Sequence, residues 1–480
     1  MTLSFRPLAA ALLASAALAG CTTVGPKYTG APDAAPGAAG RQAFLRGDAA
    51  ATSTAPAARW WDALNDPVLS GLIDKGLANA PDIAAANARI AQARAGLAAN
   101  RTALVPSLNA SGAVPYINVP ADVFGGDKGG RTDTTVYNLG FDSSWELDLF
   151  GGTRSKIAGA SARVEAAQAS ADDARVTLSA EIARLYVSLR ARQAVLALLD
   201  QQAGIDAQLI NLAQQRLNGG TAPEQPLAQA RGQAAQTEGD RAKTRADITV
   251  LIDQLAVLTG QEPGALDDTL SAPAPLPLPP QSVAVGDPAT LLRRRPDIRM
   301  AERQLAAANA DIGAQIAAGL PRITFMGLLG LGGTSIGDVV DPGKIIGLAL
   351  PQLRWSLFDG GRNKAQVTGK REAYAEAEAN YRKTVLTALQ DAEGALTRFG
   401  SQRQVYGKAL DTQVQAVRAQ ALQQQRANAG TVAQSDALSA QRQQIQTAQA
   451  AAAAAAELTT DFVAVEKALG LGWQTPAQER

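Results

Sequence analysis

Two stretches of the sequence are almost free of helix-breaking residues over a length that few folds can use. They run from Thr153 to Arg216 and from Asn363 to Ala427, and neither contains a proline. Proline and glycine are the residues that most disfavour a helix interior, and the first stretch has only Gly159 and Gly204. At about 1.5 Å per residue it would form a helix of about 96 Å. Ordinary globular domains do not use such helices, so the sequence predicts an elongated helical framework.

Both stretches belong to an internal duplication. Motifs from the first half of the chain recur in the second half, at an offset of about 215 residues at first and about 210 afterwards. The recurring pairs are Ala80-Pro81-Asp82-Ile83 with Arg295-Pro296-Asp297-Ile298, Trp145 to Gly152 with Trp355 to Gly361, Arg216 to Thr221 with Arg426 to Thr431, and Leu258-Thr259-Gly260 with Ala468-Leu469-Gly470.

Each copy is predicted to contain a helix, paired strands, a very long helix, a tight turn and a returning helix. The opening helices are predicted over Asp66–Leu104 and Ala289–Gly319, and two such copies would make a slab four helices wide. The predicted boundaries are 59–262 for the first repeat (hairpin 104–150, long helix 153–217, return helix 227–260), 263–288 for a proline-rich spacer, 289–472 for the second repeat (hairpin 321–358, long helix 363–427, return helix 432–469) and 473–480 for a C-terminal tail.

The amino terminus has the pattern of a bacterial lipoprotein. Residues 1–20 contain a basic start and an apolar stretch too short to span a bilayer, which predicts a signal peptide. Leu18-Ala19-Gly20-Cys21 resembles a lipobox, and Cys21 is the only cysteine in the chain. We expect Cys21 to carry acyl chains such as palmitate. The next residue is Thr22 rather than aspartate, which favours the outer membrane, and residues 21–58 are predicted to be an extended tether.

Composition excludes most catalytic chemistry. The chain has no histidine, so imidazole catalysis and histidine metal ligands are excluded, and one cysteine cannot build a multi-cysteine metal site. A formal net charge of +1 gives no excess of bases for nucleic acid. Carboxylates on the long helices have arginines at helical spacing, as Glu181 has Arg184, which indicates salt bridges. We therefore expect neither enzymatic activity nor a cofactor, apart from the covalent lipid, and no metal.

The hydrophobic period changes from 3.6 to 2 between the first helix and the long helix. From Tyr137 to Leu149 apolar side chains occupy odd positions, whereas Asp142, Glu146 and Asp148 occupy even ones. This alternation is typical of a transmembrane barrel strand, with these three acids facing the lumen and making it prefer cations. A soluble sheet with one wet face is the alternative interpretation. In the first hairpin the partner strand is predicted around Leu108–Tyr116, across a turn at Gly125–Gly130.

Four strands per chain cannot close a membrane barrel, because open edges in lipid leave backbone groups unpaired. The chain must therefore oligomerise. A dimer would supply eight strands and a trimer twelve, and the pattern does not choose between them.

Several segments resemble the signature segments of TolC-like outer-membrane efflux lipoproteins of the NodT type, over nearly the whole mature chain. These segments are Val24-Gly25-Pro26-Lys27-Tyr28, Trp60-Trp61, Asp66-Pro67-Val68-Leu69, Arg294 to Ile298 with Ala301-Glu302, Ala307 to Gly313, Trp355 to Arg362 and Lys467 to Trp473. The resemblance implies a mixed α and β membrane protein: a homotrimer with a twelve-stranded outer-membrane barrel and a periplasmic helical tunnel. A periplasmic adaptor and an inner-membrane pump of the resistance-nodulation-division type are the implied partners.

The resemblance also implies sites at the tips of the helical hairpins. Relatives receive the adaptor at such turns, and the corresponding residues are Arg216, Gly220, Arg426, Gly430 and Thr431. Relatives also carry an acid at the aperture, where this sequence has Ser439; Asp436 or Glu224 could replace its charge. The alternative is that the tip glycines only make turns and the tip charges are only solvated.

We conclude from the sequence that the chain is a passive exit duct for small molecules such as drugs and toxic compounds, in the outer membrane of a Gram-negative bacterium. An exit duct for protein secretion and a non-conducting structural coiled-coil lipoprotein are the alternatives.

Overall fold

The computed structural model describes residues 23–47, 50–120 and 131–473. The chain divides into two compact units. The strand unit comprises Met1–Pro32, Ile90–Ala167 and Ala301–Tyr381, and the helical unit comprises Asp33–Arg89, Gln168–Met300 and Arg382–Arg480. Each unit is therefore built from segments of both predicted repeats. Cys21, the signal peptide and most of the C-terminal tail lie outside the described residues.

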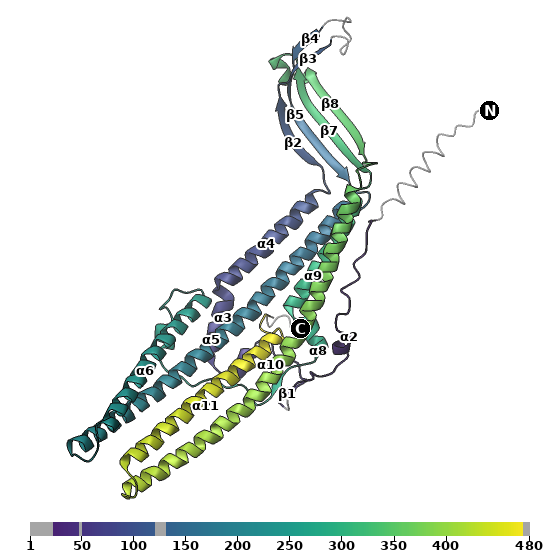
Figure 1. Cartoon of the computed structure of the whole chain (residues 1–480). Helices are drawn as coiled ribbons and strands as arrows, with labels where there is room; N and C mark the ends of the chain where they lie inside the picture. The colour runs from purple at the N-terminus through teal and green to yellow at the C-terminus, as the bar shows by residue number, and fades with distance from the viewer. Residues whose placement is uncertain (1–22, 48–49, 121–130, 474–480) are drawn as a thin grey trace. The chain divides into compact units, whose positions relative to one another are not determined.

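The strand unit contains a four-stranded antiparallel sheet (Figure 1). Its order is β2 (Ser107–Ala113), β5 (Tyr137–Leu147), β7 (Arg322–Gly333) and β8 (Ile345–Arg354). The β5–β7 ladder joins the two halves of the sequence and was not predicted. Alternation within a strand shows which side chains share a face, but it does not show which distant strand becomes the neighbour or in which register the two strands pair.

The first predicted hairpin is more divided than the sequence indicated. The partner expected as one strand over Leu108–Tyr116 is β2 followed by β3 (Tyr116–Pro120), and β3 pairs with β4 (Arg131–Thr135) in a separate ladder. Pro115 lies at the break, where it has no backbone N–H to give to a ladder. The predicted turn at Gly125–Gly130 lies outside the described residues.

The second hairpin also differs in detail. Two short helical turns, η3 (Ile336–Val339) and η4 (Pro342–Lys344), connect β7 to β8. β8 ends at Arg354, so Trp355 and Leu357 lie beyond it, although the predicted hairpin extended to residue 358.

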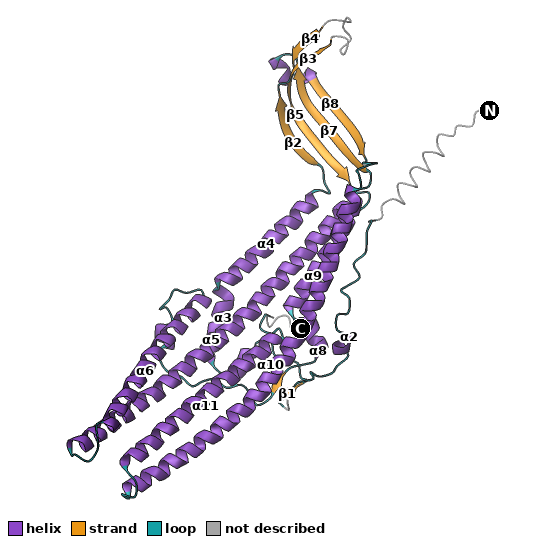
Figure 2. Cartoon of the chain, viewed as in Figure 1, coloured by secondary structure: helices purple, strands orange, loops and turns teal. Residues whose placement is uncertain are grey.

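Two helices of 67 residues dominate the chain (Figure 2). They are α5 (Gly152–Asn218) and α10 (Arg362–Asn428), where the sequence predicted 153–217 and 363–427. Each is followed, after a tight turn, by a shorter helix, α6 (Gln225–Leu258) or α11 (Gln434–Ala468). Within the described ranges, no helix is both long and apolar enough to cross a membrane.

The opening helix of each predicted repeat is broken, contrary to the prediction of single helices over 66–104 and 289–319. The structure has α3 (Pro67–Asn79) and α4 (Pro81–Thr102) in the first repeat, and α8 (Pro288–Arg294) and α9 (Pro296–Ala318) in the second. Proline at the start of α4 and of α9 cannot donate to the preceding turn and restricts the residue before it, so each break falls before a proline.

The expected tether and spacer are partly folded. Residues 21–58 include α2 (Pro36–Ala39) and β1 (Ala51–Thr52), and residues 263–288 include α7 (Asp267–Leu270) and β6 (Val283–Ala284). β1 and β6 pair in parallel within the helical unit. Leu270 is fully buried, and its carbonyl accepts a hydrogen bond from Gln193 at 2.6 Å. The periodicity analysis missed these contacts because both segments are too short and irregular to show a period.

Candidate functional sites at the sheet face and the helix tips

The four strands of the large sheet carry four charged residues, and the register places all of them on one face. Asp142 and Glu146 lie on β5, and Arg322 on β7 is paired with Arg354 on β8. We call this the charged face. Asp142 is held by its neighbour on β2, because the Ser111 hydroxyl donates a hydrogen bond to its carboxylate.

The opposite, charge-free face is apolar. Its exposed rings include Phe141, and Trp145 stacks on Phe325 across β5 and β7 with ring centroids 6.2 Å apart. Its other large members are Leu108, Tyr137, Leu139, Leu147, Ile323, Leu329, Leu331, Ile345 and Leu353. A sheet with one charge-free apolar face and one polar face suits a wall between lipid and water.

Asp148 does not belong to the charged face, contrary to the prediction. β5 ends at Leu147, and the Asp148 carboxylate accepts hydrogen bonds from the backbone N–H groups of Thr153 and Arg154, each at 2.9 Å. It therefore caps the first turn of α5, where the helix dipole also stabilises its negative charge. The sequence analysis extended the alternation one residue past the end of the strand.

Asp359 occupies the equivalent place before α10, and the sequence analysis missed this role. Its carboxylate accepts the N–H groups of Gly361 at 2.9 Å and Asn363 at 2.8 Å. These backbone hydrogen bonds, that from Asn363 foremost, lower the pKa of Asp359. The signal was present in the repeated Trp145 to Gly152 and Trp355 to Gly361 segments, each of which has an aspartate within three residues before its first glycine.

The segment after the predicted lipidation site is fixed within the strand unit. The Val24 N–H donates to the Phe150 carbonyl at 3.0 Å, between β5 and α5, and Asn309 donates to the Pro26 carbonyl at 2.9 Å. Gly25 has a φ of 106° and passes so close to Gly313 that an added Cβ would lie 2.6 Å from the Gly313 Cα. Position 25 therefore requires glycine, whereas a Cβ at Gly313 would lie 3.0 Å from both the Ser155 hydroxyl and the Val24 carbonyl oxygen.

The two tips of the helical unit repeat one turn geometry. The N–H of Thr221 donates to the Arg216 carbonyl at 2.9 Å, and Thr431 makes the same bond to Arg426 at the same distance. The threonine hydroxyls reach the same carbonyls at 3.0 Å. Gly220 and Gly430 have φ values of 67° and 72°, which favour glycine.

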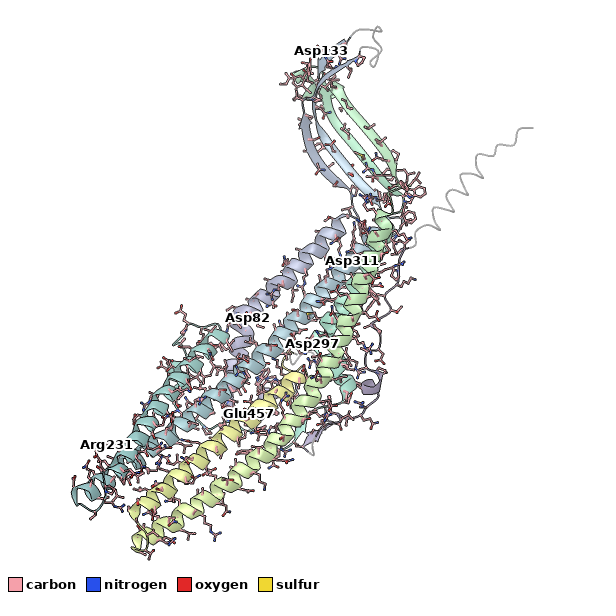
Figure 3. The ribbon with its side chains drawn as sticks, in the orientation of Figure 1. Asp82, Asp133, Arg231, Asp297, Asp311 and Glu457 are labelled. Atoms are coloured by element: carbon pink, nitrogen blue, oxygen red, sulfur yellow. The ribbon has the colours of Figure 1, made fainter. Side chains whose placement is uncertain are left out.

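All the predicted tip residues are exposed to solvent. The turns use the backbone carbonyls of Arg216 and Arg426, so both guanidinium groups remain available to a partner. The Ser439 hydroxyl donates back to the Ser435 carbonyl at 2.8 Å. Glu224 precedes α6 without making a side-chain cap, and Asp436 lies in the first turn of α11. Figure 3 marks Arg231 on α6, whose guanidinium donates to Gln214 of α5 at 3.1 Å.

A buried polar group lies behind the tips and was missed by the sequence analysis. Asp206 on α5 is 2% exposed, and its carboxylate accepts the Thr237 hydroxyl of α6 at 2.6 Å. Gln202 donates to the same hydroxyl at 3.1 Å, and Arg442 of α11 lies 3.5 Å from Asp206. The available signal was the helical spacing of Gln202 and Asp206 beside the apolar positions Leu198, Ile205 and Leu209.

A cavity of about 300 Å³ adjoins this group. It is lined by α5, α6 and α11 through Leu209, Leu212, Pro226, Ser435 and Arg442, and Arg216 also borders it. Near their tips the two helical hairpins thus meet through the Asp206–Arg442 ion pair and the buried cluster of Ile205, Leu438 and Ile445, with this cavity beside them.

The Arg294 to Ile298 signature has a structural role in the helical unit. Arg295 donates to the Ala468 carbonyl at 2.7 Å and pairs with Asp297, which Figure 3 labels. Burial raises the pKa of Glu466 on α11 to about 8, and the positive charge of the neighbouring Arg294 partly opposes this rise. The signature therefore fixes the end of α11 against α9.

Three comparisons with known proteins show which proteins the whole chain resembles. The family model described as outer membrane efflux protein matches residues 72–261 and 288–471. The chain is 31% identical to outer membrane protein OprJ of Pseudomonas aeruginosa, over 70% of each chain. It is 28% identical to the probable outer membrane lipoprotein SilC of Salmonella typhimurium, over 79% of this chain and 80% of the other. The outer-membrane channel OprN superposes with a TM-score of 0.84 at 29% identity, covering 94% of this chain and 100% of OprN.

Proposed function

The chain belongs to the outer membrane efflux protein family, and on this premise we propose that it is the exit duct of a tripartite efflux system. The predicted family, outer-membrane location and efflux function are confirmed by these relatives. The proposed partners are a periplasmic adaptor and an inner-membrane pump of the resistance-nodulation-division type, and the proposed substrates are small molecules. The observation that most directly supports a duct is the sheet with one charge-free face and one charged face, in a chain of this family.

Three copies share the barrel in this proposal. β2 and β8 are the edges of the described four-stranded sheet, and the antiparallel order makes them run in opposite directions. β8 of one copy can therefore pair with β2 of the next in the same antiparallel pattern. In lipid, unpaired strand edges cost several kcal/mol for each backbone group, so closure is strongly favoured. Trimerisation supplies twelve strands, and the duplicated long helices form the periplasmic tunnel.

Lipid attachment at Cys21 completes the anchoring. Val24 donates its N–H to the Phe150 carbonyl between β5 and α5, so only two residues of sequence separate the proposed lipidation site from a residue that is fixed in the strand unit. No cofactor other than this lipid is proposed. Transport through the duct is passive, and the pump supplies direction.

The helix tips are the proposed adaptor-docking and aperture region. Arg216, Gly220, Arg426, Gly430 and Thr431 form two exposed turns of identical hydrogen bonding, which suits a repeated contact around a trimer. Asp436 and Glu224 are proposed to supply acidic charge at the aperture, near Ser439.

The test uses the full chain purified from outer membranes. We expect crosslinking to yield a trimer, planar bilayers to show ion conductance, and co-expression with a compatible adaptor and pump to restore efflux of small molecules in a strain lacking its own duct. A trimer that never conducts would support the structural-lipoprotein alternative, and conductance with export of a protein but of no small molecule would support the secretion alternative.

A further inference from the structure

The charged face of the sheet is not polar throughout. On β7 and β8 its central positions are Met326, Leu328, Ile346, Leu348 and Leu350, which we call the apolar stripe. Met326 pairs with Leu350, and Leu328 pairs with Leu348. All except Leu328, which is half-buried, are between 42% and 56% exposed.

The stripe departs from the alternation expected of a strand that separates lipid from water. On β5 the charged face carries Asn138, Asp142, Ser144 and Glu146, as the pattern requires, whereas β8 is apolar on both faces through most of its length. Contiguous apolar surface that faces water is unfavourable in a soluble environment and commonly marks a binding site.

Across one row of paired residues, which runs from strand to strand, the side chains change from polar to apolar. The register sets Asn109, Asp142, Leu328 and Leu348 side by side on β2, β5, β7 and β8. Asp142 is the only charged residue of these four strands in the rows that contain the stripe. Since neighbouring strands lie about 4.8 Å apart, the acid and the outer edge of the stripe are about 10 Å apart.

We propose that the apolar stripe and Asp142 form a transit binding site for amphipathic organic cations on the inner wall of the duct. The apolar body of the molecule lies on Leu328 and Leu348, and its positive group lies toward Asp142. This inference rests on the proposed function, because the charged face becomes an inner wall only in the closed barrel. The duct would then select among molecules by apolar area as well as by size.

The test measures block of potassium current through the reconstituted full-length trimer by a series of alkyltrimethylammonium ions, from tetramethylammonium to hexyltrimethylammonium. Every member carries one positive charge, and only the apolar chain grows. We expect the affinity of the wild type to rise about twofold for each added methylene, which is the increase that corresponds to burying half of each methylene group. In the Leu328→Thr/Leu348→Thr variant we expect the affinity to be nearly independent of chain length.

Two controls separate the contributions. Leu353→Thr changes the same strand on the charge-free face and should leave the chain-length dependence as in the wild type. Asp142→Asn should weaken block by the same factor for every member of the series, because it removes charge and leaves the stripe. Threonine suits a strand, and the unblocked potassium current shows that each variant has assembled. Met326→Thr/Leu350→Thr provides a second stripe variant should the first not assemble.

The outcomes distinguish the two levels of the argument. Normal conductance with an unchanged chain-length dependence in the stripe variants would overturn the transit site while leaving the duct intact. A wild-type trimer with no conductance would overturn the proposed function itself. Equal loss of chain-length dependence in Leu353→Thr would also contradict the assignment of the site to the charged face.

Discussion

At the scale of single residues, Glu466 links burial to pH. Its carboxyl group is buried on α11, and burial raises its pKa from 4.5 to about 8. The folded chain therefore keeps the proton that the unfolded chain loses, so the free energy of unfolding falls as pH rises from about 4.5 to about 8. We expect Glu466→Gln to be more stable than the wild type at pH 8, by about 4 kcal/mol, and nearly equal to it near pH 4.5.

Thermal unfolding of the assembled protein at a series of pH values measures this difference. Glu457→Gln is the matched control, since Glu457 lies exposed on the same helix (Figure 3) and its substitution removes no buried charge, so it should change the free energy of unfolding at pH 8 by less than about 1 kcal/mol. A stability gap for Glu466→Gln that is the same at pH 4.5 and pH 8 would contradict the titration argument.

Residue roles were predictable from the sequence where local spacing defines them. The turn glycines Gly220 and Gly430 follow from such spacing, and Asp142 and Glu146 lie on one face as the alternation predicted. Asp148 was misplaced because alternation alone does not show where a strand ends. Asp206 was missed because its importance comes from burial between α5, α6 and α11, which is a tertiary property.

At the scale of elements, the ion pair of Asp206 and Arg442 ties α11 to α5. Removing the Asp206 carboxylate leaves the Arg442 charge without this partner, and leaves the Thr237 hydroxyl with the Gln233 carbonyl at 3.1 Å as its acceptor. Breaking such a pair costs more than an exposed pair contributes, and Arg442 is still 22% exposed, so we expect Asp206→Ala to cost about 2 kcal/mol. Hydrogen exchange in 434–445 should then quicken by about thirtyfold, since 1.4 kcal/mol corresponds to tenfold.

Asp200→Ala is the matched control on the same helix. Asp200 is 48% exposed and pairs with Arg241 at 2.6 Å, and exposed pairs contribute about 0 to 1 kcal/mol. Its effect on exchange in 434–445 should be small. Equal effects from the two variants would show that the buried group does not hold the tip.

Element type was largely predictable, and element boundaries were less so. The long helices are visible in the sequence because proline is absent over more than sixty positions, which leaves helix as the only regular structure of that length. The short helices were predicted as continuous because apolar spacing persists across Pro81 and Pro296, although each proline ends the preceding turn.

At the scale of the whole molecule, the two faces of the sheet meet different surroundings only once copies assemble. In one chain Leu348 on the charged face is 56% exposed and Leu353 on the opposite face is 66% exposed, so both are open to a reagent. A shared barrel would place Leu348 in water and Leu353 in lipid. This contrast arises from the assembly. The strand pattern describes a single chain, so it did not show whether two or three copies share the barrel.

We therefore expect a charged, membrane-impermeant thiol reagent to label Leu348→Cys, and to label Leu353→Cys at least tenfold more slowly, in isolated outer membranes. The background is low because the wild-type chain has one cysteine, Cys21, which is the proposed site of acylation. After unfolding in denaturant the two variants should be labelled equally, which controls for intrinsic reactivity. Equal labelling in the membrane would mean that both faces meet water, and the sheet would then be a soluble layer that shares no barrel.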